Sequence, residues 1–136
     1  MTKIDAARLW SLNHRLLMSV IATVAAEVGA LGLEVKELFV LSEVDEHPYP
    51  AELAAALVMP KPTMTLYVKR LEAAGLLRRE IDPDDLRKHR LALTPAGRKV
   101  MQRGMTLLAD AFAARVGRLS AGEQAQLRGL LEKLTG

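Results

Sequence analysis

The sequence predicts a mainly α-helical fold with one small β-hairpin, and three observations support this prediction. Most of the chain carries apolar side chains at helical spacing, and 50% of its 136 residues are hydrophobic. Between residues 76 and 94 the apolar pattern changes from a period near 3.6 to a period near two. The length fits a single domain, residues 1–136, with a core of ordinary size.

Composition excludes several function classes. The chain contains no cysteine, which excludes disulfides, thiolate metal sites and thiol-based redox sensing, and a reducing cytoplasm is the expected compartment. Glycine-rich phosphate loops, nucleophile elbows and paired-histidine motifs are missing, so we expect no enzyme activity and no cofactor. His14, His47 and His89 are not at ligand spacing on one element, and we expect no metal site.

Residues 16–33 form a long apolar stretch that raises the possibility of a membrane helix or a signal sequence. Glu27 within the stretch, and Gly29 and Gly32 near its end, argue against that interpretation. A helix buried on more than one side is the favoured alternative, and we expect no membrane association.

The first predicted helix runs from about Asp5 to Val28, and its apolar residues form two stripes. The stripes are Leu9-Leu12-Leu16-Val20 and Trp10-Leu17-Ile21-Val24-Val28. A surface helix of a monomer normally buries a single face. We therefore expect a second packing partner for this helix, which another subunit would supply.

Two shorter helices are expected next. After a turn at residues 29–32, a second helix places Leu38 and Phe39 on its apolar side and ends near residue 45. Pro50 suits the first position of a short third helix, because its missing N–H costs nothing there, and this helix turns Leu53 inward.

Pro62 can open a fourth helix that closes at Gly75. Its core stripe is Met64, Val68 and Leu71, at positions i, i+4 and i+7. The side chains left outside are Thr63, Thr65, Leu66, Lys69 and Arg70. Such a helix suits a DNA major groove, because compact residues can approach base edges at its N-terminal end while cations contact phosphates.

The segments LLRREID and RKHRLALT are predicted to be two strands of a hairpin with DPDDL at its tip. The four positions after the tip are Arg87, Lys88, His89 and Arg90. A two-stranded ribbon with cations near its tip is a wing that can touch phosphate or the narrow minor groove. We expect one of Asp84 and Asp85 to pair with and orient Arg87, and the other to lie in the turn.

The basic character of the chain is regional. From Lys61 to Arg103 there are eleven Lys/Arg against five Asp/Glu, a balance of +6, whereas the remainder has eight against eleven, a balance of −3. The basic region coincides with the fourth helix and the hairpin, which favours a nucleic-acid partner. Only five aromatic residues occur, too few to favour stacking on single-stranded bases.

Thr94 and Pro95 suit the N-cap and first position of a long fifth helix, and Ser120 with Glu123 suits the capping box of a sixth. The expected buried stripe of the sixth helix is Leu127, Leu130, Leu131 and Leu134. The chain then begins and ends with helices that no third layer covers. Dimerisation through residues 1–30 and 95–136 would cover them.

The order of four helices, a hairpin and two helices resembles the MarR family of winged helix-turn-helix transcriptional regulators over nearly the whole chain. The most specific match is the wing signature D-x-R-x-x-x-L-x-L-T, which here is Asp85, Arg87, Leu91, Leu93 and Thr94. The resemblance implies a winged helix-turn-helix lobe over residues 33–94, flanked by N- and C-terminal dimerisation helices.

The resemblance also implies a function: a cytoplasmic homodimer, most often a repressor, that binds a pseudo-palindromic operator in double-stranded DNA. The resemblance implies DNA contacts by Thr63, Thr65, Lys69 and Arg70 on the fourth helix and by Arg87 on the wing. To these we add Lys61, Leu66, Lys88 and Arg90 as expected DNA-binding residues. Leu66 departs from the polar or basic residue common in the family and could touch a thymine methyl. Leu86 replaces a second wing arginine, so affinity would depend more on Lys88 and Arg90.

A small aromatic or anionic effector is implied as well, bound between the dimer helices and the DNA-reading lobe, with Trp10, His14 and Phe39 as candidate ligand residues. Two alternative functions remain at this point: a winged-helix protein-interaction module and a nonspecific architectural DNA-binding protein. The first predicts no affinity for duplex DNA. The second predicts salt-dependent binding without a preference for an operator.

Overall fold

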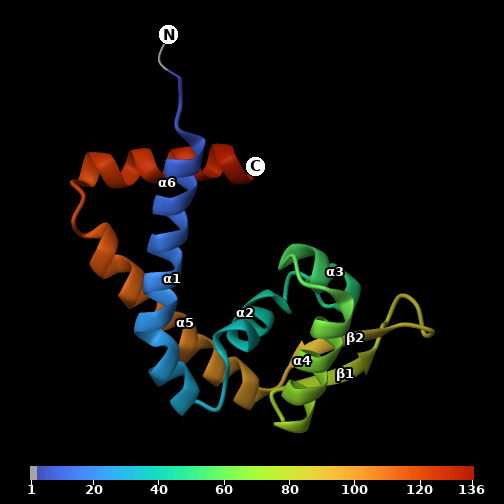
Figure 1. Cartoon of the computed structure of the whole chain (residues 1–136). Helices are drawn as coiled ribbons and strands as arrows, with labels where there is room; N and C mark the ends of the chain where they lie inside the picture. The colour runs from blue at the N-terminus through green and yellow to red at the C-terminus, as the bar shows by residue number, and fades with distance from the viewer. Residues whose placement is uncertain (1–2) are drawn as a thin grey trace. The chain divides into compact units, whose positions relative to one another are not determined.

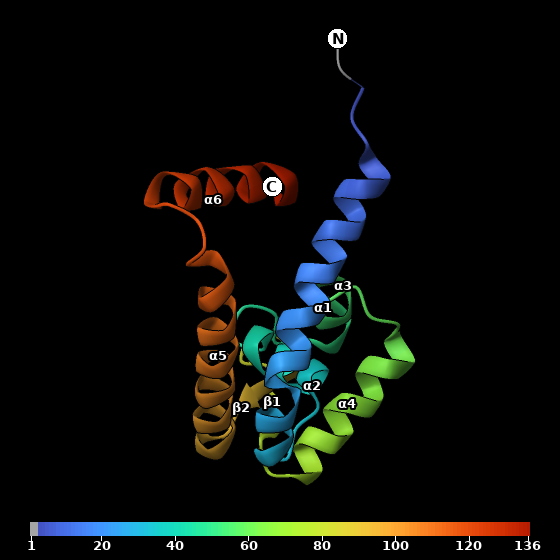
Figure 2. The ribbon, with the colours of Figure 1, turned by 60° about the vertical axis from the view of Figure 1, so that its left-hand side comes forward.

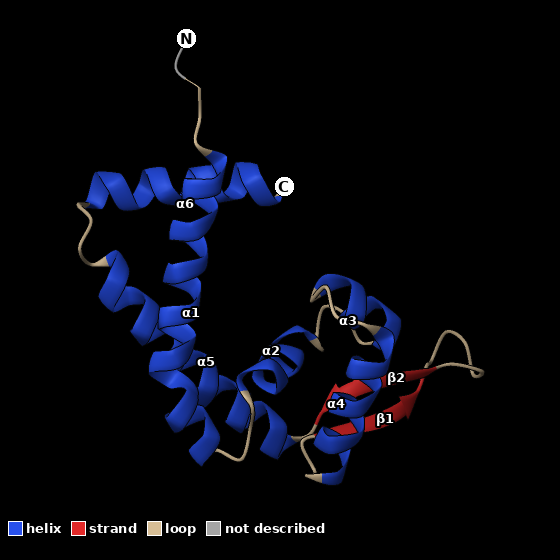
Figure 3. Ribbon diagram, viewed as in Figure 1, coloured by secondary structure: helices blue, strands red, loops and turns tan. Residues whose placement is uncertain are grey.

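The computed structural model describes residues 3–136, and this part of the chain forms six helices and one antiparallel hairpin (Figures 1 and 3). The helices are α1 (Ala6–Ala30), α2 (Val35–Glu43), α3 (Pro50–Ala56), α4 (Lys61–Ala73), α5 (Pro95–Val116) and α6 (Ala121–Thr135). The strands are β1 (Leu77–Ile81) and β2 (His89–Leu93). The predicted fold class is confirmed. The first two residues of the predicted segment 1–30 lie outside the described residues.

The chain folds into two compact units. The first, termed the terminal unit, combines the N-terminal stretch through Val24 with Leu107–Gly136. The second, termed the lobe, is Ala25–Thr106. The lobe contains α2, α3, α4 and the hairpin, together with the C-terminal end of α1 and the N-terminal part of α5.

The core of the lobe draws a buried side chain from each of its main elements. The largest fully buried residues are Leu38, Leu41, Leu53, Met64, Leu71 and Leu91. The predicted core stripe of α4 is confirmed, because Met64, Val68 and Leu71 are all buried. Tyr67 of the same helix is buried too, and the sequence analysis did not place it in the core.

The hairpin pairs Leu77 with Leu93 and Ile81 with His89. Leu91 and Leu93 are buried on one face of β2, as the period of two requires. The second strand begins later than the segment RKHRLALT suggested, so Arg87 and Lys88 lie in the loop that connects the strands.

The start of α5 is fixed by a cap and a close backbone contact. The Thr94 hydroxyl accepts a hydrogen bond from the Gly97 amide at 2.9 Å and donates one to the Gly75 carbonyl oxygen at 2.6 Å, which confirms the predicted N-cap. A Cβ atom on Gly97 would lie 1.9 Å from the Leu76 carbonyl oxygen. Only glycine allows α5 to begin this close to the chain that enters β1.

One boundary of the terminal helices differs from the prediction. The first helix extends to Ala30, so Gly29 lies inside it and the turn is short, with Gly32 at φ +84° providing the left-handed residue. The leucine stripe of α6 is exposed in a single chain, as expected for a terminal helix that no third layer covers: Leu134 is 82% exposed, and Leu130 and Leu131 are exposed as well. A single copy offers no layer for these leucines. The capping box of Ser120 and Glu123 is confirmed.

No single helix of the described chain is long and apolar enough to cross a membrane; only α1 and α2 together, as a bent pair, meet that test of length and composition.

Candidate nucleic-acid interface

The outer face of α4 carries the predicted contact residues. Figure 2 shows α4 along one side of the lobe. Lys61, Thr65 and Lys69 are exposed at intervals of four residues, which places them in one row of the helix surface. Leu66 and Arg70 form a second exposed row, and Thr63 is half-buried. The structure therefore brings together the residues expected on this helix.

The inward residues of α4 determine which face points outward. Tyr67 packs in the core with Met64, Val68 and Leu71, so four anchors prevent rotation of the helix about its axis. Burial raises the pKa of Tyr67, and the nearby Glu34 carboxylate adds to the rise. The apolar spacing 64, 67, 68, 71 is the signal from which this fourth anchor could have been recognised.

The cations of α4 differ in their surroundings. Arg70 Nη1 lies 3.6 Å from Glu34 Oε1, at the start of α2. Within residues 3–136, no carboxylate lies within ion-pair distance of Lys61 or Lys69. The ammonium groups of Lys61 and Lys69 are thus available to an anion, whereas the Arg70 guanidinium already pairs with the Glu34 carboxylate.

In the wing loop, residues 82–88, an aspartate pairs with the exposed cation Arg87. Asp85 Oδ1 accepts hydrogen bonds from the Arg87 backbone amide at 3.0 Å and from Arg87 Nε at 3.3 Å. Asp84 lies in the turn, where its amide donates to Asp82 Oδ1 at 2.8 Å. The prediction that one aspartate pairs with Arg87 while the other lies in the turn is confirmed. The Arg87 side chain remains 92% exposed.

The base of the wing contains a buried polar cluster that the sequence analysis missed. Asp82 is only 3% exposed, and its Oδ2 accepts a hydrogen bond from the Tyr49 hydroxyl. This bond lowers the pKa of Asp82 and raises the pKa of Tyr49. Arg90 Nε is buried nearby and has no hydrogen-bond partner among residues 3–136. The partners lie 33 positions apart, so no local motif reveals the pair.

Three further cations of the basic region are paired with acids. Arg78 lies 2.8 Å from Glu80, Arg79 3.1 Å from Glu72, and Arg98 3.0 Å from Asp45, measured from guanidinium nitrogen to carboxylate oxygen. The Asp45 carboxylate raises the pKa of Arg98 through this hydrogen bond. The unpaired positive charge of the region, as far as the structure describes it, is thus concentrated on α4, the wing and the outer side of α5.

The three candidate ligand residues belong to different units of the chain. Trp10 and His14 stack on α1, with ring centroids 6.1 Å apart and an interplanar angle of 28°, and Trp10 is 67% exposed. Phe39 belongs to the lobe, where it is half-buried.

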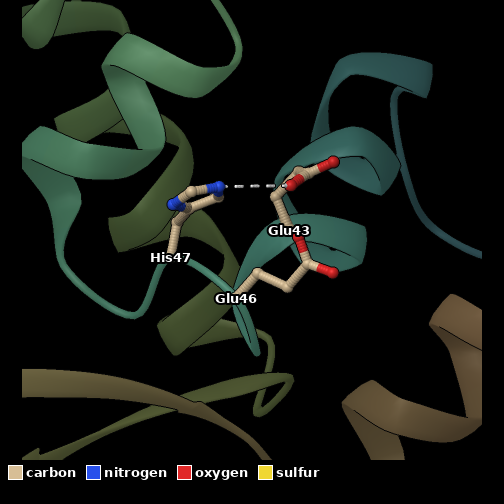
Figure 4. A group of neighbouring side chains, drawn as sticks. All are labelled: Glu43, Glu46 and His47. Atoms are coloured by element: carbon tan, nitrogen blue, oxygen red, sulfur yellow. Dashed lines mark ion pairs between the residues drawn. The ribbon is translucent and has the colours of Figure 1, made fainter. Parts of the chain in front are cut away.

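One group of side chains has ligand atoms close enough to hold a metal ion. The ligand atoms of Glu43, Glu46 and His47 all lie within 4.8 Å of one another. Figure 4 shows them at the C-terminal end of α2, with His47 facing Glu43 at 3.9 Å. The sequence analysis compared histidines only and overlooked this E-x-x-E-H segment. The side chains are exposed or half-buried, as in an ordinary surface ion pair.

Comparison with known proteins identifies the family. The sequence profile of the MarR family matches residues 31–88. The chain is 30% identical over 132 residues to the HTH-type transcriptional repressor Rv2887 of Mycobacterium tuberculosis. The aligned residues make up 96% of this chain and 95% of the relative.

Solved structures agree with the sequence match. The crystal structure of Rv2887 in complex with DNA matches with a TM-score of 0.77 and 28% identity, covering 94% of this chain and 98% of that one. Its complex with salicylic acid matches with a TM-score of 0.77 and 30% identity, covering 96% and 98%. The resemblance seen in the wing signature is thereby confirmed, and the chain belongs to the MarR family of transcriptional regulators.

Proposed function

We propose that this protein is a sequence-specific, double-stranded DNA-binding transcriptional repressor that acts as a homodimer and is released by a small aromatic or anionic effector. The observation that carries the proposal is the exposed face of α4, where Thr65, Lys69 and Arg70 project from a helix whose opposite face is buried. The relative Rv2887 is named a repressor and has been crystallised with DNA.

The geometry suits reading of a major groove by α4. Thr63 and Thr65 near its N-terminal end can approach base edges, Leu66 can contact a thymine methyl, and Lys61, Lys69 and Arg70 can contact phosphates. The wing adds a second contact through Arg87, Lys88 and Arg90, directed at the backbone or the adjacent minor groove. One lobe reads one half-site, and a dimer reads two half-sites about 34 Å apart.

Dimerisation is supported by the apolar surface of the terminal unit. Leu9, Leu12 and Leu17 of α1 are exposed in a single chain, as are Leu130 and Leu134 of α6. Covering these residues with the same residues of a second copy removes apolar surface from water symmetrically. We assign the dimer contact to residues 1–30 and 95–136.

An effector of the salicylate type is supported by the complex of Rv2887 with salicylic acid. We assign Trp10, His14 and Phe39 as candidate ligand residues, and operator release as the consequence of binding. Salicylate titrated into a preformed protein–operator complex is expected to release the DNA and to raise the melting temperature of the free protein. A broad set of aromatic acids without either effect would remove this part of the proposal.

We further assign the protein to the cytoplasm, where it would reach chromosomal DNA, and assign it no catalytic activity. The support is that the relatives it matches are named transcriptional regulators.

The decisive experiment selects an operator from random duplexes and then measures affinity by fluorescence anisotropy at several salt concentrations. A regulator should lose affinity log-linearly with salt and should prefer its operator over random duplex by ~10³-fold or more. Equal affinity for all duplexes would indicate an architectural protein, and no affinity at low salt would indicate a protein-interaction module.

Matched variants locate the interface within the same experiment. Replacing both Lys69 and Arg70 with alanine should weaken operator binding by about tenfold or more, because two phosphate contacts are lost. Lys36 of α2 provides the control, since it is an exposed cation outside both the predicted DNA-binding residues and the proposed dimer segments. Lys36→Ala should leave affinity unchanged. Equal losses in both variants would contradict the assignment of α4.

A further inference from the structure

Tyr49 contacts the wing loop at both of its ends. Its hydroxyl donates a hydrogen bond to Asp82, the first residue of the loop. Its ring lies beneath the ammonium group of Lys88, the last residue of the loop, with 6.0 Å between Nζ and the ring centroid. Asp82 in turn accepts the Asp84 amide, so one buried carboxylate joins the turn of the wing to Tyr49.

The position of Tyr49 in its own helix does not explain its identity. It occupies the N-cap of α3, where serine, threonine, aspartate or asparagine would bond to the free amides of the first turn. Tyr49 makes no such side-chain bond. Its polar atom is directed to the wing instead, and the preceding residue adds a backbone link, since the Leu91 amide donates to the Pro48 carbonyl oxygen at 2.7 Å.

We propose that Tyr49 and Asp82 are positioning residues for DNA binding, which hold the wing loop against the segment entering α3 so that the wing and the helix-turn-helix meet the duplex as one rigid body. The proposal rests on the proposed function, because the wing has a target only if the protein binds DNA. It concerns two residues outside the predicted contact set.

The physical reason is the cost of ordering a loop. Seven residues, 82–88, connect the strands, and fixing the backbone of each one costs conformational entropy. Two backbone hydrogen bonds close the loop, from the Asp82 amide to the Lys88 carbonyl oxygen (3.0 Å) and from the Lys88 amide to the Asp85 carbonyl oxygen (2.9 Å). Together with the bonds to the Asp82 carboxylate, they order the loop in the free protein, so DNA binding does not have to order it. Lys88 and Arg90 then reach phosphates from a fixed place.

The test uses Tyr49→Phe, Asp82→Asn and the double variant, with Asp84→Asn as the charge-matched control for Asp82→Asn. Tyr49→Phe removes one hydroxyl, keeps the ring beneath Lys88 and leaves the net charge unchanged. Asp84→Asn removes the same charge from the same loop without touching the Tyr49 bond. Circular dichroism and thermal unfolding establish that each variant is folded.

The first measurement is amide hydrogen exchange of residues 82–90 without DNA. Loss of a buried hydrogen bond to a carboxylate should speed exchange of the loop about tenfold in Tyr49→Phe and Asp82→Asn, and the double variant should be no faster than the faster single variant. Exchange in the core of α4 should not change. Loop exchange at the wild-type rate in Tyr49→Phe would overturn the proposal.

The second measurement is binding to a random 24-base-pair duplex across a salt series. Tyr49→Phe should bind about three- to tenfold more weakly, with a salt slope shallower by about one phosphate contact, since a mobile wing loses Lys88 or Arg90 from the interface. A merely structural role would lower the melting temperature and leave the slope intact, and that result would overturn the proposal. If the wild-type chain bound no duplex at low salt, the proposed function would fall, and the positioning role with it, whatever the exchange rates.

Discussion

The lobe and the terminal unit bury their apolar residues to very different extents. Residues 25–106 enclose Leu38, Leu53, Met64 and Leu91 completely within one chain. In the terminal unit, α6 has no buried residue at all, and Trp10 and Leu134 are mostly exposed although both helices are amphipathic. The lobe therefore has its own core, whereas the apolar side chains exposed in the terminal unit support the proposed dimer contact.

The cations of the lobe fall into a paired group and a free group. The lobe keeps Arg78, Arg79 and Arg98 paired with acids and leaves Lys61 and Lys69 free among the described residues. Ion pairs on a surface contribute little stability, so their effect is to shape the field that an approaching anion meets. Free cations on α4 and the wing, beside neutralised neighbours, favour a partner with defined phosphate positions.

The largest expected effect comes from charging the apolar face of α6. The double substitution Leu130→Glu, Leu134→Glu should weaken dimerisation by at least about a thousandfold, because four leucines per dimer lose a burial worth about 1.5–3 kcal/mol each. Sedimentation equilibrium measures the change. Ala125→Glu, which adds a charge on the opposite face of the same helix, should leave the dimer intact. A double variant that dimerised like the wild type would remove α6 from the interface.

A pair of identical substitutions compares the packing of the two units. Gly97→Ala should destabilise the lobe by about 3 kcal/mol, because the new methyl group would meet the Leu76 carbonyl oxygen, which belongs to the backbone and cannot yield. Gly129→Ala in α6 meets nothing within 4 Å and should stabilise by about 0.5–1 kcal/mol. Urea unfolding provides both values. A change in the free energy of unfolding with the same sign in both variants would contradict the contrast between the units.

Val58 gives a smaller effect within the lobe. This residue links α3 to α4 with φ +52°, a conformation that β-branched residues rarely adopt, and its side chain is 90% exposed. Val58→Gly should raise the free energy of unfolding by about 0.5–1 kcal/mol, since relief of strain exceeds the added entropy of the unfolded chain. Thermal unfolding shows whether the variant is more stable than the wild type. A destabilised variant would show that Val58 contributes contacts that outweigh its strain.

The smallest expected effect concerns the shared guanidinium of Arg70. Glu34→Gln removes the acid 3.6 Å from Arg70 and should tighten duplex binding about two- to threefold, the size of an exposed ion pair. The gain should shrink as salt rises, because the pair is screened. Anisotropy titrations at two salt concentrations measure the gain in affinity and its dependence on salt. Weaker binding in this variant would mean that Glu34 orients Arg70 for DNA instead of competing for it.

The sequence predicted the local features well. The helix caps at Thr94 and Ser120, the core stripe of α4 and the Asp85–Arg87 pair all follow from residues a few positions apart, where spacing determines geometry. The exposed residues of α4 followed from the same periodicity.

Features that join distant segments could not be predicted. The bond between Tyr49 and Asp82 depends on how the hairpin packs against the start of α3, and no periodicity records that contact. The α6 stripe was recognised as apolar, but periodicity cannot distinguish a stripe that meets its own chain from one that meets a second copy. The Glu43–Glu46–His47 group was missed because only histidines were compared.

Native mass spectrometry of the protein mixed with its selected operator measures DNA binding and the number of bound chains in one experiment. We predict one duplex that carries two chains, which pair through their terminal helices and contact the DNA with two copies of α4. A complex with a single chain, or no complex under conditions in which the protein is folded, would contradict it.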